Sequence, residues 1–335
     1  MKRVLSICVA LLLIFLFVGC GTSNNNKEQS TKIIVAEFRA LSWLPVHLAY
    51  ELGYFEEQGL DVEFAVYRDG TLALQGMHAN NSQFCLLSQG TIFLGEDQGL
   101  RSELVIAMKK NRPFVLATAK SINSIDQLKG KIVFAGLPGS EPYQLVSNVL
   151  TNAGLNIKED ITYVNLDYGA ALAALGSGQI KASYFGIEYT SDLEKAGVNI
   201  VFSTGDPETA LEFYGSDKFE TDVICCSKEF SKKNPETVQK FVNAVLKALY
   251  WVQEHSDAEI AAKITSYYSS MSQEDLALRI NYLRPAFSND GYISKKGFDA
   301  VENFFMKYGI PQTKIEYEDI VNMNYLENAQ TSLTE

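Results

Sequence analysis

The segment Trp43–Val62 reads WLPVHLAYELGYFEEQGLDV and decides the fold. Its apolar residues Leu48, Leu52 and Phe55 recur at steps of three and four, which predicts a helix with one buried face. Gly59 then supplies the left-handed residue that commonly ends a helix, and an extended run follows. A helix that leads directly into a strand is half of a βαβ unit.

The same alternation of β-rich and helical runs continues on both sides of this segment, where the helix itself is expected over Leu44–Glu57. It predicts an α/β protein with two open, mostly parallel sheets, and the residues after Ser227 read as helices. About 305 residues after the N-terminal region suggest two domains, because single cores rarely grow beyond about 250–300 residues. The strands are expected at Lys32–Phe38, Asp61–Tyr67, Gln83–Leu87, Leu104–Lys109, Phe114–Ala119, Lys131–Ala135, Ile161–Leu166, Ala182–Gly186, Asn199–Ser203 and Asp222–Ser227.

The first residues have the order of a secretory signal. Lys2 and Arg3 are basic, Val4–Val18 is apolar, and the run stops at Gly19-Cys20. A transmembrane helix needs about 20 apolar residues, so it is the weaker interpretation. Phe17-Val18-Gly19-Cys20 resembles a bacterial lipobox, with Phe17 where Leu is usual. We therefore expect a signal peptide over 1–19, lipidation at Cys20 and a flexible tether over 20–31; an ordinary signal with a chance cysteine is the alternative.

Charge and cysteine content exclude several classes of partner. Without Lys2 and Arg3 the chain keeps 27 basic and 40 acidic residues, a net charge of about −13. This argues against nucleic acid and anionic lipid as partners. The cysteines Cys85, Cys225 and Cys226 read as buried small hydrophobes. Metal-ligand spacing is lacking, so we expect neither a metal nor a cofactor.

Three stretches carry a resemblance to a known family. They are Trp43–Val62, Asp126–Lys131 and Lys233–Glu236, and the resemblance extends from residue 32 to about 326. The chain resembles the NMT1-like group of solute-binding proteins, which bind nitrate, taurine, sulfonates or thiamine pyrimidines and have the type II periplasmic-binding fold. The first stretch is the most specific of the three.

The resemblance implies a two-lobed protein with two crossover strands. Lobe one would hold 32–116 and 222–335, and lobe two would hold 117–221. A small-molecule ligand would bind in the cleft between the lobes, and an ABC permease with its ATPase subunit would recognise the closed form. The implied function is that of a monomeric solute-binding lipoprotein, held by its lipid anchor on the extracytoplasmic face of the cell membrane.

Candidate ligand contacts come from loops beyond the carboxyl ends of the predicted strands, where ligands meet open α/β sheets. Six loops qualify: 39–43, 68–71, 88–91, 136–141, 167–169 and 186–189. From them we select Arg39, Ser42, Trp43, Gly70, Thr71, Ser88, Gln89, Gly139, Ser140, Phe185, Glu188 and Tyr189.

Most of these residues also have a structural interpretation. Gly139-Ser140 can offer amides and a hydroxyl to an anion or carbonyl, or can cap a helix. Trp43 can stack on a planar ligand or pack against its own helix. Ser88 can cap a helix while Gln89 contacts the ligand. Glu188 can accept hydrogen bonds from an amine or ring N–H, or can begin a helix.

Two arginines, Arg39 and Arg68, lie in these loops. Each would suit a sulfonate or carboxylate through paired donors, but each could equally form a surface ion pair. Abundant Tyr and Phe favour an organic, aromatic ligand over nitrate. The sequence does not name the ligand.

Two other classes of function compete with this one. Pyrimidine synthases of the yeast type share the fold that the resemblance implies. They carry a cysteine- and histidine-rich catalytic segment, which Cys225-Cys226 does not match. Hydrolase and nucleotide-binding motifs are also lacking, so we expect no enzyme. A surface adhesin or sensory co-receptor could use the same fold to present a ligand to a partner protein.

Overall fold

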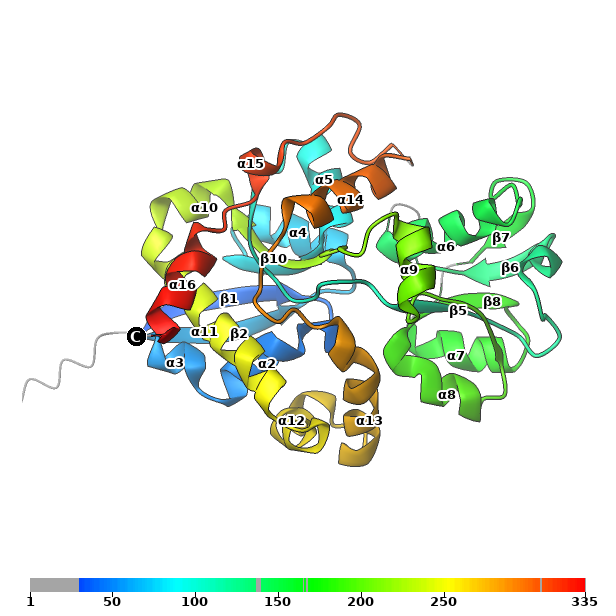
Figure 1. Cartoon of the computed structure of the whole chain (residues 1–335), viewed down its shortest axis with the longest axis horizontal. Coiled ribbons are helices and arrows are strands. Elements are labelled where there is room, and N and C mark those ends of the chain that lie inside the picture. The colour runs from blue at the N-terminus through cyan, green and yellow to red at the C-terminus, as the bar shows by residue number, and fades with distance from the viewer. Residues whose placement is uncertain (1–29, 137–139, 165, 167, 308, 335) are drawn as a thin grey trace, which may run out of the picture. The chain divides into compact units, whose positions relative to one another are not determined.

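Two five-stranded sheets, each flanked by helices, organise the residues that the structure describes (Figure 1). The computed structural model describes residues 30–136, 140–164, 166, 168–307 and 309–334. Residues Thr31–Glu335 form one compact unit. The expected signal peptide and Cys20 lie outside the described residues, as does nearly all of the expected tether.

The first sheet has the strand order β2-β1-β3-β10-β4. β1 pairs in parallel with β2 and β3, whereas β10 is antiparallel to β3 and β4. Its strands are β1 (Thr31–Glu37), β2 (Leu60–Val66), β3 (Phe84–Ser88), β4 (Ser102–Ala107) and β10 (Asp222–Ser227). The helices of this lobe one are η1 (Leu41–Trp43), α2 (Leu44–Glu51), α3 (Tyr54–Glu57), α4 (Gly70–His78), α5 (Gln89–Asp97), α10 (Lys228–Lys233), α11 (Pro235–Glu254), α12 (Asp257–Ile264), η4 (Thr265–Tyr268), α13 (Gln273–Leu283), η5 (Arg284–Ala286), α14 (Lys295–Met306), α15 (Tyr317–Ile320) and α16 (Asn324–Thr334).

The second sheet repeats this plan in the order β7-β6-β8-β5-β9. β6 is parallel to β7 and β8, and β5 is antiparallel to β8 and β9. Its strands are β5 (Phe114–Thr118), β6 (Lys131–Phe134), β7 (Ile161–Tyr163), β8 (Ala182–Gly186) and β9 (Asn199–Ser203). The helices of this lobe two are η2 (Ile125–Leu128), α6 (Glu141–Asn152), α7 (Tyr168–Gly176), η3 (Ile187–Tyr189), α8 (Thr190–Lys195) and α9 (Pro207–Tyr214).

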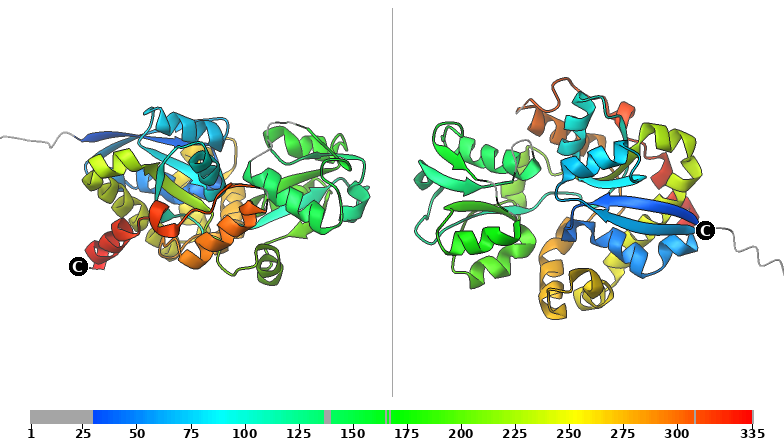
Figure 2. Two further views of the ribbon diagram at one scale, coloured as in Figure 1. Left: turned by 90° about the horizontal axis from the view of Figure 1, so that it is seen from above. Right: turned by 180° about the vertical axis from the view of Figure 1, so that it is seen from behind.

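The chain passes between the sheets twice, through residues 108–113 and again through 204–221, which we call the first and second crossover (Figure 2). Each sheet thus contains one antiparallel strand that arrives from the other sheet, which confirms the predicted α/β fold class. The expected boundary between residues 116 and 117 falls inside β5. Because β5 pairs only within the second sheet, the first crossover ends before Phe114.

The helix expected over Leu44–Glu57 is broken into α2 and α3. Gly53 has φ 75°, a left-handed conformation, so the backbone turns there and the helix restarts at Tyr54. Gly59 is also left-handed, at φ 70°, and β2 follows at once, as the sequence predicted. Two short helices therefore replace one longer helix.

α11 places most of its apolar face in the core of lobe one. It begins at Pro235 and packs against α2, α3 and α16. The rings of Phe84 on β3 and Phe241 stack with centroids 3.9 Å apart. The α11 residues that are fully buried are Val238, Phe241, Val242, Val245, Leu246, Ala248, Leu249 and Val252.

Candidate functional site

The helices α5 and α6 begin on either side of the second crossover and come from different lobes. The Gln89 amide at the start of α5 donates to the carbonyl of Thr221 at 2.8 Å. The hydroxyl of the same Thr221 donates to Oε1 of Glu141, at the start of α6, at 2.7 Å. Two helix N-termini that follow strand ends therefore meet where the lobes join.

A buried set of charged residues lies at this point. Lys109 Nζ is 2.5 Å from Asp222 Oδ2 and donates to Ser42 Oγ at 3.0 Å. Arg112 Nη1 is 3.1 Å from Asp222 Oδ2, and its Nη2 is 3.1 Å from Glu141 Oε2. The contacts join lobe one, lobe two and both crossovers. We call Ser42, Lys109, Arg112, Glu141, Thr221 and Asp222 the junction cluster.

Burial and pairing set the charges of the junction cluster. Burial lowers the pKa of Lys109, Arg112 lowers it further, and Asp222 opposes both effects. For Asp222, burial works to raise the pKa, but Arg112 and Lys109 hold it below its usual value. Burial raises the pKa of Glu141 against the pull of Arg112. Two cations thus face two carboxylates, so the cluster is balanced internally.

Glu188 lies beside the junction cluster. It forms no ion pair with any residue that the structure describes. It is half-buried in η3, directly after β8. Its charge partly opposes the lowering of the Lys109 pKa by burial, and it adds to the raising of the Tyr268 pKa by burial and Glu37. This places an acceptor carboxylate from lobe two near the residues of lobe one.

Several buried polar atoms around the junction cluster have no hydrogen-bond partner among the described residues. They are Gln89 Oε1, Arg112 Nε, Ser140 Oγ and Gln144 Oε1. Gln89 uses its amide nitrogen on the Glu220 carbonyl, at 2.6 Å, and leaves the oxygen free. An unpaired buried polar atom is costly, so such atoms commonly indicate a missing water or ligand.

The structure favours the packing interpretation for Trp43. The side chain is fully buried, and its indole N–H donates to the Phe38 carbonyl at 3.1 Å. Its ring also meets Phe38 edge-on. Because no surface of the indole is accessible in this conformation, the expected stacking on a ligand is replaced by a role in the core.

The loop after β1 is fixed by a second buried cluster. His47 Nε2 lies 2.7 Å from Oε2 of the fully buried Glu37, and the His47 ring stacks on Tyr267 at 4.6 Å. Tyr268 donates to the Ala40 carbonyl at 3.1 Å. Arg39, half-exposed, donates to the Tyr267 carbonyl at 3.1 Å. These contacts hold the loop that carries Ser42.

The other candidates divide between the lobe junction and the lobe cores. Ser140 is the N-cap residue of α6, but its hydroxyl makes no capping bond. Ser88 bonds to the Thr91 hydroxyl instead of capping α5. Gly70 begins α4 close to Leu87, and Thr71 next to it is half-buried. Arg68 is exposed beside Asp69, Phe185 is buried in lobe two, Tyr189 is at its surface, and Gly139 lies outside the described residues.

Tyr189 belongs to a contact between the lobes away from the crossovers. α13 of lobe one packs against η3 of lobe two. Arg279 Nη2 is 2.6 Å from Asp192 Oδ2, and the Arg279 guanidinium lies over the Tyr189 ring at 4.3 Å. Burial raises the pKa of Tyr189. The lobes are therefore in contact along α13 as well as at the junction cluster.

Sequence reasoning missed Lys109, Arg112 and Asp222 as site residues. Each was assigned to a strand end or not selected at all, whereas Glu141 belonged to the candidate loop 136–141 but was not selected from it. The available signal was the presence of charged residues at the ends of almost wholly apolar runs, such as Ser102–Met108 and Val223–Cys226. Charges that follow a buried strand are candidates for a buried pair.

The family model described as NMT1/THI5 like matches residues 41–259. The chain belongs to this family. The matched segment includes both crossovers and every residue of the junction cluster. It also includes the decisive segment that begins at Trp43.

Relatives with the same architecture support this assignment. The Bacillus subtilis protein YtlA, which is named a binding protein, is 24% identical over 96% of this chain and 95% of its own length. The formylaminopyrimidine-binding protein of Halalkalibacterium halodurans is 22% identical over 77% and 78%. The alkanesulfonate-binding protein of Xanthomonas axonopodis, solved with bound MOPS, superposes with a TM-score of 0.70 at 15% identity, over 88% of this chain and 99% of that one.

These comparisons establish the family of the chain and its fold. Several relatives and structural neighbours are named as binding proteins, for aliphatic sulfonates, formylaminopyrimidine and nitrate, and two of the neighbours are named as parts of ABC-type transporters. Enzymes also occur among the similar proteins: the pyrimidine phosphate synthase THI13 of Saccharomyces cerevisiae is 26% identical over 62% of this chain and 63% of its own length. The sulphonate-binding neighbour from Escherichia coli and the nitrate-binding neighbour from Synechocystis are named periplasmic proteins. Among the described residues, no helix is long and apolar enough to cross a membrane.

Proposed function

We propose that the protein is the solute-binding lipoprotein of an ABC importer, which captures a small organic molecule between its lobes and delivers it to the permease. The observation that carries this proposal is the lobe junction. Two helix N-termini from different lobes, an unpaired carboxylate and several unpartnered polar atoms converge there. Such a site binds a ligand by closing around it, because closure excludes water and strengthens polar contacts.

The charges at the junction favour one kind of ligand. Lys109 and Arg112 already pair with Asp222 and Glu141, so neither presents a free positive charge to a sulfonate. Glu188 has no ionic partner among the described residues and would accept hydrogen bonds from a ring N–H or an ammonium group. We therefore place a pyrimidine-like or other aromatic heterocycle ahead of a sulfonate or taurine-like ligand.

The N-terminal residues support the location in this proposal. Lipidation at Cys20 would hold the body at the extracytoplasmic face of the membrane, near a permease and its ATPase subunit. Replacement of this residue, Cys20→Ser, tests the anchor by fractionation. We expect the variant in the soluble fraction, and an unchanged membrane fraction would remove the lipoprotein assignment.

Calorimetric titration of the chain without residues 1–20 tests the ligand class directly. Aminopyrimidines, alkanesulfonates and taurine form the panel, and size-exclusion chromatography with light scattering tests the expected monomer. Saturable 1:1 binding of a heterocycle supports the proposal, whereas binding of alkanesulfonates alone reverses the order of the two ligand classes. A sensory receptor would bind the same ligand without supporting its uptake, which a transport assay with a deletion strain distinguishes.

A further inference from the structure

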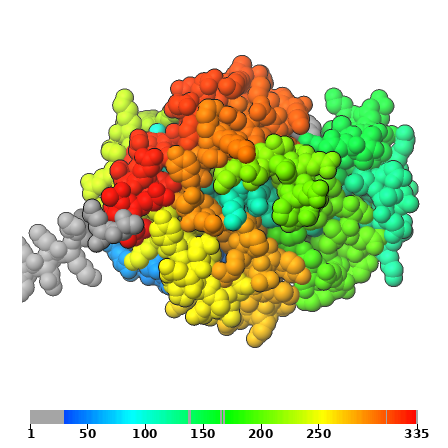
Figure 3. All heavy atoms as spheres, in the orientation of Figure 1, coloured from blue at the N-terminus to red at the C-terminus, as the bar shows by residue number. Residues whose placement is uncertain are grey.

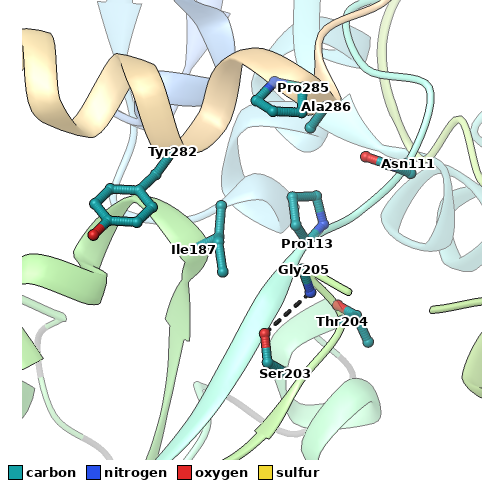
Figure 4. A pocket seen from close by; sticks show the side chains of 9 residues that line it. All are labelled: Asn111, Pro113, Ile187, Ser203, Thr204, Gly205, Tyr282, Pro285 and Ala286. Atoms are coloured by element: carbon teal, nitrogen blue, oxygen red, sulfur yellow. Dashed lines mark hydrogen bonds between the residues drawn. The ribbon is translucent and has the colours of Figure 1, made fainter. Parts of the chain in front are cut away.

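A pocket of about 290 Å³ lies on the two crossovers (Figure 4). We call it the hinge pocket. In the space-filling view, cyan atoms of the first crossover show in a hollow between orange residues of lobe one and green residues near α9 (Figure 3). Its walls include Asn111 and Pro113 of the first crossover, Ile187 and Ser203 of lobe two, and Tyr282 and Pro285 of lobe one.

The hinge pocket is separate from the junction cluster. Lys109 and Arg112 direct their charged groups to Asp222 and Glu141. Asn111 and Pro113, which alternate with them along the same crossover, line the pocket instead. The first crossover therefore runs between the two features, and a molecule in one does not occupy the other.

The lining of the hinge pocket is neutral and mostly apolar. Its described wall residues include no Lys, Arg, Asp or Glu. The Asn111 side-chain oxygen is buried and accepts no hydrogen bond from a described residue. Ser203 Oγ accepts from the Gly205 amide at 3.1 Å, so its own proton remains available. The Asn111 side chain thus carries an unpaired acceptor within apolar walls, and a small rotation of its amide would turn this buried oxygen toward the pocket.

We propose that the hinge pocket binds a second small molecule, a neutral planar ring system with one N–H or O–H donor directed at Asn111 Oδ1. The space is about twice that of an apolar cavity of about 150 Å³ that holds a benzene ring, which indicates a bicyclic ring system. A charged ligand would lose its hydration without gaining a partner. The donor would satisfy the unpaired oxygen, and the rings would contact Pro113, Ile187 and Pro285.

Binding at this position would affect both lobes at once. Ile187 belongs to lobe two, Tyr282 and Pro285 belong to lobe one, and Asn111 lies on the segment that joins them. The two crossovers are tied together here, since the Thr204 hydroxyl donates to the Arg112 carbonyl at 3.0 Å. A molecule that contacts all of these parts favours the lobe arrangement that forms its walls.

Indole and 1-methylindole test the hinge pocket, because they have nearly the same shape and differ in the N–H donor. Calorimetric titration of the chain without residues 1–20 is expected to show 1:1 binding of indole. Binding of 1-methylindole is expected to be about tenfold weaker, because the Asn111 oxygen stays unpaired. Equal affinities for the two compounds, or no saturable binding of indole, would overturn the proposal.

Two variants locate the binding. Ser203→Phe fills the pocket and should abolish indole binding, whereas Ile200→Phe, at an exposed position of the same strand, should leave it unchanged. Asn111→Ala should remove the difference between the two compounds even if Ser203→Phe does not fold. Unchanged indole binding in Ser203→Phe, or a difference that persists in Asn111→Ala, would place the site elsewhere.

Discussion

Arg112 joins the two lobes through Glu141: its Nη2 atom, on the first crossover, lies 3.1 Å from Oε2 of a carboxylate at the start of α6. The same guanidinium reaches Asp222 of the first sheet at 3.1 Å. One buried side chain therefore holds a carboxylate from each lobe. Removal of that side chain leaves two buried carboxylates with a single ammonium between them.

We expect Arg112→Met to lower the free energy of unfolding by about 3–5 kcal/mol, because it leaves buried charges uncompensated. Denaturant unfolding at pH 7 measures the change. Lys195→Met is the matched control: it also breaks a contact between the lobes, but Lys195 and Asp275 are both more than half exposed. Equal effects of the two substitutions would contradict the importance of the junction cluster.

Trp43→Ala should destabilise the ligand-free protein by about 3–5 kcal/mol, the usual cost of removing a fully buried large side chain. Trp43→Phe should recover part of this loss, although it cannot donate to the Phe38 carbonyl. Thermal unfolding without ligand is the measurement. An unchanged melting temperature would restore the interpretation that Trp43 belongs to the ligand site.

Glu188→Gln should lower the affinity for ligand and leave the stability of the free protein nearly unchanged, in contrast to Trp43→Ala. The carboxylate has no ionic partner among the described residues, so the melting temperature of the free protein should change little. Affinity for a ligand with a ring N–H or ammonium group should fall about tenfold, because a charge-assisted hydrogen bond becomes a neutral one. Glu194→Gln, at an exposed position on α8, is the control. Loss of stability without loss of affinity would assign Glu188 a structural role.

Glu220 should make stability depend on pH. Its side chain is buried, one oxygen accepts from Ser294 at 3.0 Å, and the other has no partner among the described residues. Burial raises its pKa from 4.5 to about 6, against the Ser294 hydrogen bond. The folded state therefore binds this proton more tightly than the unfolded state, so stability is gained below pH 4.5 and is lost as the pH rises through 6.

Glu220→Gln removes the loss of stability that ionisation of Glu220 causes above pH 6, and it keeps an acceptor for the Ser294 hydroxyl. At pH 7.5 the variant should be more stable than the parent by up to about 2 kcal/mol, and at pH 4 the difference should vanish. Urea unfolding at both pH values measures it, with Glu212→Gln as an exposed control. A difference independent of pH would show that the ionisation of Glu220 is not its cause.

The strands could be predicted from the sequence because each is a short run made mostly of apolar residues. Many of these runs lie next to a residue that favours turns, such as Gly, Asp or Asn. It did not predict the break at Gly53, since a single glycine is tolerated inside a helix and only the observed φ of 75° shows the turn. The strand at Phe114 was predicted, but its place in the second sheet was not, because that depends on its pairing with the distant strands β8 and β9.

The site was harder to predict because its partners are far apart in the chain. Lys109 and Asp222 are separated by more than a hundred residues, and only the antiparallel entry of β10 beside β4 brings them together. Glu188 and Ser140 were selected as candidates because they follow strand ends, a local signal. Trp43 follows the same signal, but its indole turns into the core, which depends on tertiary packing.

Native mass spectrometry of the chain purified without residues 1–20, compared with its denatured mass, tests the central claim most directly. A solute-binding protein should carry a small molecule that is released on denaturation and that binds again unaltered to ligand-free protein. Conversion of the recovered compound on incubation with the protein would show an enzyme. No bound mass, together with no binding of pyrimidines, sulfonates or flavins, would contradict the assignment of a solute-binding function.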